Sequence, residues 1–245
     1  MAIASPSVNA LEIVNVRVPG RLHSVDLRLK PGSLVGLIGP NGSGKSTLLQ
    51  IAAGLLPAGD GSLSWQGRDY RGIGFAERGR LTAWVPQEAR FEFGFSVRSV
   101  IGQGRFAHGD DGRGVEEVLR RMDLLGLALR PVNQLSSGER QRVLIARALA
   151  TEAPLQLWDE PLAALDVRHA LEVLVLAEEL KRTGRTLLIS LHDLRLAHCL
   201  DRVAVLLDGR LCAFGPPAEV LTPELLLMVF GVKAQKGPSL ILELP

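Results

Sequence analysis

The chain has 245 residues, of which 47% are apolar and 22% are charged, and its formal net charge is +2. This composition is typical of a globular protein with a large core, and it excludes a disordered or collagen-like chain. The small net charge argues against a dedicated binder of nucleic acid, and Cys199 and Cys212 are too few for a disulfide framework or a clustered zinc site.

The first residues, MAIASPSVNALEIV, have neither a basic leader nor an apolar run of the length of a signal peptide. No apolar stretch reaches the roughly 18 to 20 residues that cross a bilayer. We therefore expect a cytoplasmic location, with any work in a membrane done by another chain.

The first element with clear chemistry is a strand, a glycine loop and a helix. Residues 33–38 are an apolar run ending at Gly39, and residues 46–53 have the composition of a helix closed by Gly54. Between them, GPNGSGKST satisfies the G-x-x-x-x-G-K-[ST] phosphate-loop pattern in the context that it requires. Backbone N–H groups of such a loop bind phosphates, Lys45 supplies a charge, and Ser46 is a ligand for Mg²⁺. The predicted nucleotide-binding residues are Gly39, Pro40, Asn41, Gly42, Ser43, Gly44, Lys45, Ser46 and Thr47.

The middle of the chain lacks strand signals. Helical stretches such as residues 115–127 dominate between positions 87 and 150. We expect a helical subdomain at about residues 88–150, inserted into a single domain that spans residues 1–245.

A second phosphate-site element follows in the sequence LQLWDE, residues 155–160. An apolar strand here carries Asp159 to the nucleotide edge, where its carboxylate is a second predicted Mg²⁺ ligand. Glu160 comes next and is positioned to orient or deprotonate the attacking water. A DE pair after apolar residues is by itself more typical of a solvated strand end, but the upstream phosphate loop favours the catalytic interpretation.

The remaining apolar runs, at residues 186–191 and 203–207, alternate with helical patterns such as residues 167–182. This alternation predicts an α/β fold with a mostly parallel sheet covered by helices.

One motif points to a family. LSSGERQR, residues 135–142, resembles the LSGGQ signature of ABC-type ATPases, although Ser137 and Glu139 replace a glycine and a glutamine. The resemblance implies that Ser136 and Gly138 open a helix whose N-terminus binds the γ-phosphate held by a partner subunit. Taken alone, the same residues could be an ordinary helix cap. The resemblance further implies a P-loop NTPase fold with an N-terminal antiparallel β part.

Three smaller motifs occur in the order that the ABC family shows: Gln87 after TAWVP, Asp166 in AALD, and His192 after TLLISL. By resemblance, Gln87 contacts Mg²⁺ and the attacking water, His192 contacts the γ-phosphate, and Asp166 shapes a dimer interface. Because the chain has one copy of each motif, the resemblance implies a homodimer with ATP and Mg²⁺ bound between the subunits. Intact catalytic motifs argue against an inert nucleotide-binding scaffold.

Adenine recognition departs from the family pattern. Many relatives carry an aromatic residue before the phosphate loop, whereas VRVPGRLHS has none, and Tyr70 comes too late. Arg21 or His23 could stack on the base, or this segment could be a solvated loop.

The segments SVRSVIGQGRFAHG, residues 96–109, and GPPAEVLTPELLLMVFGV, residues 215–232, resemble those of importers of metal chelates: ferric siderophores, haem and cobalamin. The short, aromatic-free stretch before the phosphate loop most resembles that of the ATPases of vitamin B12 importers, and this resemblance implies cobalamin as the cargo. The resemblance implies attachment at the cytoplasmic face of the membrane, a polytopic permease dimer and, through it, an extracytoplasmic substrate-binding protein.

The alternative function is a soluble ABC ATPase of DNA repair or translation. We expect the permease to dock at Phe91, Phe93 and Phe95, unless these residues line the inner face of a buried strand.

Overall fold

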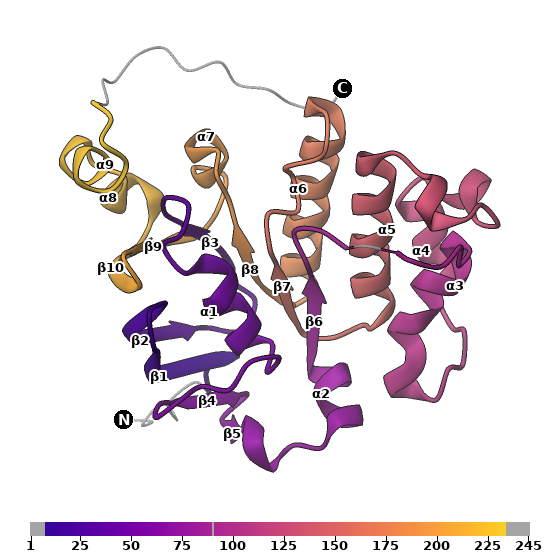
Figure 1. Ribbon diagram of the computed structural model, residues 1–245, viewed down its shortest axis with the longest axis horizontal. Coiled ribbons are helices and arrows are strands. Elements are labelled where there is room, and N and C mark those ends of the chain that lie inside the picture. Colours follow the sequence, from indigo (N-terminus) through magenta and orange to yellow (C-terminus); the bar gives the residue numbers. More distant parts are fainter. Residues whose placement is uncertain (1–7, 90, 234–245) are drawn as a thin grey trace, which may run out of the picture.

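A six-stranded sheet forms the centre of the computed structural model, which describes residues 8–89 and 91–233 (Figure 1). All neighbouring strands run parallel except β10, which is antiparallel to β9. In spatial order the strands are β10 (Arg210–Gly215), β9 (Arg202–Leu207), β3 (Leu34–Ile38), β8 (Thr186–Ser190), β7 (Leu155–Trp158) and β6 (Thr82–Val85).

Both faces of this sheet are covered, which explains its almost continuously apolar strands. All five residues of β3 are buried. Leu34 and Ile38 pack into one core, whereas Val35 and Leu37 pack into the other, as the alternation of side chains along a strand requires.

The second core lies between the central sheet and an antiparallel sheet near the N-terminus. Helix α1 (Lys45–Ala52) lies in this core, and the indole of Trp65 donates to Ala52 O at 2.8 Å. The antiparallel strands, in spatial order, are β2 (Leu22–Leu29), β1 (Leu11–Val18), β4 (Ser62–Trp65) and β5 (Arg68–Asp69).

The described residues between β6 and β7, on the right of Figure 1, form helices and 3-10 turns but no strand. They are α3 (Val97–Gly102), η2 (Gln103–His108), α4 (Val115–Arg121), η3 (Leu125–Leu127), η4 (Val132–Gln134) and α5 (Ser137–Ala150). The other helical elements are η1 (Tyr70–Gly72), α2 (Phe75–Leu81), α6 (Val167–Arg182), α7 (Leu194–Ala197), α8 (Pro217–Val220) and α9 (Pro223–Phe230). That the inserted stretch forms a subdomain with limits near residues 88 and 150 stays a prediction.

The predicted α/β fold with its antiparallel N-terminal part is confirmed, and the predicted strands end within one residue of the observed ones. The helix expected over residues 115–127 is wrong in its second half. Helix α4 ends at Arg121, because Asp123 adopts a left-handed conformation with φ 51°, and a separate 3-10 turn follows.

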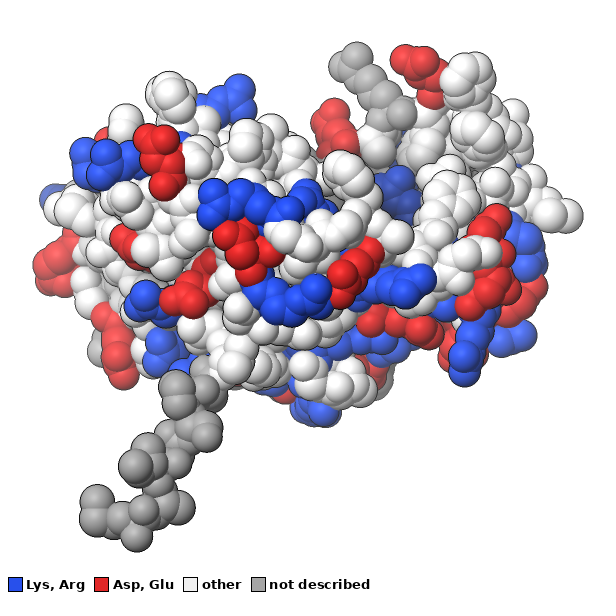
Figure 2. Space-filling view, turned by 90° about the horizontal axis from the view of Figure 1, so that it is seen from below, with Lys and Arg blue, Asp and Glu red and all other residues white. Residues whose placement is uncertain are grey.

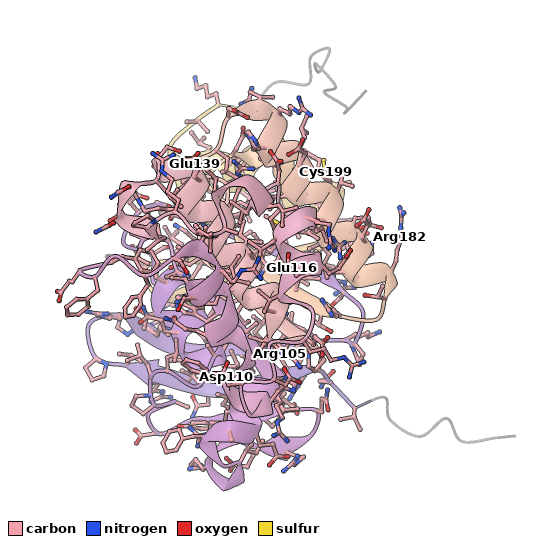
Figure 3. The ribbon with its side chains drawn as sticks, turned by 90° about the vertical axis from the view of Figure 1, so that its right-hand side faces the viewer. Arg105, Asp110, Glu116, Glu139, Arg182 and Cys199 are labelled. Atoms are coloured by element: carbon pink, nitrogen blue, oxygen red, sulfur yellow. The ribbon has the colours of Figure 1, made fainter. Side chains whose placement is uncertain are left out.

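Arg105, in η2, is only 2% exposed and connects the segment around Asp111 to the C-terminal end of α5. Its guanidinium donates to both carboxylate oxygens of Asp111, at 2.8 and 3.0 Å, and to Ala150 O at 2.9 Å. Figure 3 shows Arg105 far from Glu139, which lies in the first turn of α5. Arg105 therefore holds the end of α5 that is remote from its signature motif.

The surface of the described chain mixes both charge signs. Figure 2 shows basic and acidic side chains interspersed on the face seen from below. In residues 8–89 and 91–233, no helix combines the length and apolar character needed to span a bilayer.

Candidate functional site

The loop between β3 and α1 has the backbone geometry of a phosphate cradle. Gly39 has φ 154°, and a Cβ there would lie 2.1 Å from Leu206 O, so only glycine fits. Gly44 precedes α1 with φ 102°, and the first turn of α1 has neither a side-chain cap nor an acidic residue. The N–H groups of this turn are therefore available to an anion.

Two side chains of the loop, Lys45 and Ser43, carry polar groups that could bind a phosphate. The ammonium of Lys45 donates to Gly39 O at 2.9 Å and to Pro40 O at 3.1 Å, and its burial lowers its pKa, against the opposing effects of Glu160 and Asp159. Ser43 Oγ is buried and has no hydrogen-bond partner among the described residues. Bound phosphate oxygens would satisfy both groups.

Asp159 and Glu160 follow β7 and share one bridging residue, Ser190. The Ser190 hydroxyl donates to Asp159 Oδ1 at 2.7 Å and accepts from the Glu160 N–H at 2.8 Å. Glu160 has φ 48°, a conformation that is costly for a residue with a side chain and that this hydrogen bond helps to hold. Sequence reasoning missed Ser190, although a hydroxyl ending the apolar strand TLLIS was a usable signal.

The carboxylate of Glu160 contacts two other predicted site residues, Gln87 and His192. Gln87 Nε2 donates to Oε2 at 2.7 Å, and His192 Nε2 contacts Oε1. These residues follow the neighbouring strands β6, β7 and β8, so the strand order brings together positions 87, 160 and 192. Glu160 is 9% exposed, which leaves an oriented, largely dehydrated carboxylate beside the phosphate loop. Such a group is suited to positioning water.

The predicted magnesium ligands fit a metal held jointly with a nucleotide. The described residues contain no group of three or more His, Cys, Asp or Glu side chains arranged to hold a metal. Ser46, Gln87 and Asp159 offer one hydroxyl, one amide and one carboxylate, and Mg²⁺ commonly takes one or two carboxylates plus substrate phosphates. When bound with ATP, the ion would neutralise phosphate charge.

The signature motif forms a complete capping box. Ser136 Oγ accepts from the Glu139 N–H at 3.2 Å, and Glu139 Oε2 accepts from the Ser136 N–H at 2.7 Å. These backbone and hydroxyl contacts lower the pKa of Glu139. In the single chain the Ser136 hydroxyl therefore serves the cap of α5, accepting from the Glu139 N–H and contacting the Glu139 carboxylate.

Three predicted site residues are not joined to the catalytic cluster. Asp166 caps α6 by accepting from the His169 N–H and ring Nδ1, both at 2.9 Å. Among the described hydrogen bonds, none links Ser136, Gly138 or Asp166 to the phosphate loop or Glu160. Within one chain, the phosphate loop and the signature helix α5 belong to different parts of the molecule (Figure 1).

The hairpin between β1 and β2 packs against the phosphate loop. A Cβ at Gly44 would lie 2.9 Å from Arg21 O, and the His23 N–H donates to Gly209 O at 2.7 Å. The side chains of Arg21 and His23 are exposed at this turn. Tyr70 packs instead against Trp65 in the second core, with ring centroids 6.0 Å apart.

A parallel sheet, a glycine-rich phosphate loop and a carboxylate held at the next strand ends define a P-loop nucleoside triphosphatase. A family model described as ABC transporter matches residues 22–163, more than half of the chain. The chain belongs to the ABC transporter family and is an ABC-type ATPase.

Named relatives and solved structures agree with this assignment. The hemin import ATP-binding protein HmuV of Streptomyces coelicolor is 43% identical, over 92% of this chain and 84% of its own length. The cobalamin import ATP-binding protein BtuD of Halobacterium salinarum is 39% identical, over 93% of this chain and 58% of its own.

Among solved structures, an inward-facing transporter assigned to the metal-chelate type gives a TM-score of 0.79 at 27% identity, over 92% of this chain and 90% of its own. The dimeric ATP-binding cassette MJ0796, bound to ADP and phosphate, gives 0.76 at 26% identity, over 84% of this chain and 98% of its own.

Proposed function

We propose that this ATPase energises the import of a metal chelate through a separate permease, at the cytoplasmic face of the membrane. The observation that carries the proposal is its similarity, over more than nine-tenths of the chain, to proteins named for hemin and cobalamin import. A polytopic permease dimer and an extracytoplasmic substrate-binding protein complete the proposed system. No nucleic acid takes part.

In the proposed reaction, Lys45 and the phosphate loop bind the β- and γ-phosphates, while Ser46, Gln87 and Asp159 hold Mg²⁺. Glu160 orients the attacking water and takes up its proton. Gln87 and His192 keep that carboxylate in place, as their contacts with it support. Most of the rate enhancement then comes from positioning and from charge neutralisation.

The catalytic site needs two subunits. Lys45, Asp159 and Glu160 would come from one copy and Ser136 and Gly138 from the partner. Asp166 would shape the interface between the two copies. The lack of described hydrogen bonds between these two sets within one chain supports this division, as does the dimeric state of the similar cassette MJ0796.

The permease would dock on a groove of about 530 Å³ beside Gln87, together with the adjoining aromatic residues. Phe93 and Phe95 are 68% and 48% exposed and form an edge-to-face pair. The alternative of a buried strand is wrong, because residues 91–95 form no strand and only Phe91 packs partly against the core. Exposed aromatic residues of this kind are typical anchors of protein interfaces.

The candidate transported substrates are cobalamin and haem, for whose import the similar proteins are named, and a ferric siderophore is the third. The lack of an aromatic residue before the phosphate loop favours cobalamin, whereas the relative from Streptomyces coelicolor is named for hemin. A soluble ATPase of DNA repair or translation is not favoured, because the named relatives are import proteins.

Reconstitution tests this proposal. The subunit is combined in liposomes with candidate permeases and binding proteins from its own genome, and ATP-dependent uptake of cobalamin, haem and a ferric siderophore is measured. We expect uptake of one tetrapyrrole, and none with a Lys45→Ala subunit. Failure to assemble with any membrane protein, together with normal ATP hydrolysis, would refute the transport function.

A further inference from the structure

The amide of Gln141, on α5, is unused by the site described above. Gln141 is only 4% exposed, and its Nε2 has no hydrogen-bond partner among the described residues. A buried donor without an acceptor costs free energy, and native proteins rarely retain one without a reason.

The surroundings of Gln141 suggest the reason. It lines the groove beside Gln87, and the same groove is lined by Ala163 and Ala164, three and four residues after Glu160. The carbonyl of Ala164 passes close to the same helix, because a Cβ at Gly138 would lie 3.2 Å from Ala164 O. Gly138 and Gln141 are three residues apart and share one face of α5. The loop that follows Glu160, with its backbone carbonyl acceptors, therefore lies close to the face of α5 that carries Gln141.

We infer that Gln141 is a positioning residue, whose Nε2 donates to a backbone carbonyl of residues 161–165 in the dimer that closes around ATP. The amide is unpaired in the single chain and would be paired in the closed dimer, so the bond would bias the equilibrium toward closure. The bond would tie the loop that follows Glu160 to the helix that begins at Ser136. Gln141 acts through this loop and touches no reacting atom. The inference rests on the proposed two-subunit site.

The test exploits an unusual combination of effects. Gln141→Leu removes the unpaired amide at similar volume, so the nucleotide-free subunit should gain stability, with a melting temperature raised by about 2–4 °C. At saturating ATP, turnover should fall about fivefold, the value of one hydrogen bond made only in the closed state, while ATP binding to the subunit is unchanged. Gln134→Leu, an exposed glutamine in the same helical stretch, should change neither quantity.

A second measurement separates this inference from the proposed function. In a Glu160→Gln background, ATP-driven dimerisation is followed by sedimentation, and addition of Gln141→Leu should weaken it about fivefold. If the Glu160→Gln subunit itself fails to dimerise, the two-subunit site is wrong and the inference falls with it. If dimerisation is unaffected by Gln141→Leu, the inference alone is wrong. It is also overturned if the substitution lowers the melting temperature, or if only permease-coupled transport is impaired, which would make Gln141 a contact of the membrane subunit.

Discussion

At the scale of single residues, the site depends on Glu160, whose carboxylate accepts from Gln87 and contacts His192. Its backbone is held in a left-handed conformation with φ 48°. The carboxylate is thus held by Gln87 and His192, while Ser190 holds the Glu160 backbone.

We expect Glu160→Gln to bind ATP normally and to lose about a hundredfold or more of its hydrolysis, because the base is removed while the Lys45 cradle remains. The ATP-bound dimer should accumulate. Phosphate release and sedimentation with ATP measure the two effects, with Glu172→Gln, a partly exposed carboxylate on α6 that pairs with Arg168, as the control. Turnover near that of the wild type would exclude Glu160 as the base.

A second residue-scale prediction concerns stability and pH. The Arg105 guanidinium lowers the pKa of Asp111 from its ordinary 3.8 to about 2. Because the folded-state pKa lies below the unfolded value, this carboxylate stabilises the fold above about pH 4, and the stabilisation is lost as the pH falls toward 2. Asp111→Asn should therefore be less stable than wild type at pH 7, and the difference should vanish near pH 2. Denaturation curves at several pH values test this, with Asp110→Asn as the control; a difference that is independent of pH would contradict it.

At the scale of elements, the β1–β2 hairpin is the segment expected to contact the adenine base of ATP. Its turn contacts the phosphate loop through Arg21 O but offers no aromatic side chain. Nucleotide affinity should rest mainly on the phosphates, so GTP should compete almost as well as ATP. Competition binding tests this, with Arg21→Ala and His23→Ala compared to detect stacking. A preference for ATP above about a hundredfold, near 2.7 kcal/mol, would show an adenine pocket elsewhere.

The segment after Gln87 is the second element whose role can be tested. Phe93→Ser and Phe95→Ser should abolish permease binding and uptake while sparing ATP binding by the isolated subunit, because both side chains are exposed. Phe75→Ser is a matched control, since Phe75 is 89% exposed on α2, away from the groove. Normal uptake with both variants would place the docking site elsewhere.

At the scale of the whole molecule, the proposed division of the site between two copies predicts complementation. Lys45→Ala should lose phosphate binding, and Ser136→Asp should keep its helix cap but repel the γ-phosphate. Each variant alone should be inactive, whereas a mixture can form dimers with one intact site. ATPase assays of the mixture should recover up to roughly a quarter of wild-type turnover. Activity in either variant alone would contradict the division.

Much of this molecule could be predicted from the sequence, because the relevant signals are local. The glycine loop, Lys45 and the DE pair lie within short segments whose spacing requires a strand, a turn and a helix. The order of the smaller motifs was sufficient to indicate the ABC family, and continuous apolar runs were sufficient to locate most strands of the central sheet.

Other features depended on packing between distant segments. The strand order β8-β7-β6 brings Gln87 and His192 onto Glu160, and it places Ser190 between Asp159 and Glu160. The partial burial of Phe91 beside the exposed Phe93 and Phe95 is seen only in the folded chain. The same is true of the Gln141 amide, which is buried without a hydrogen-bond partner among the described residues. Hydrogen bonding and burial at these positions are set by neighbours tens of residues away in the chain, so no local pattern encodes them.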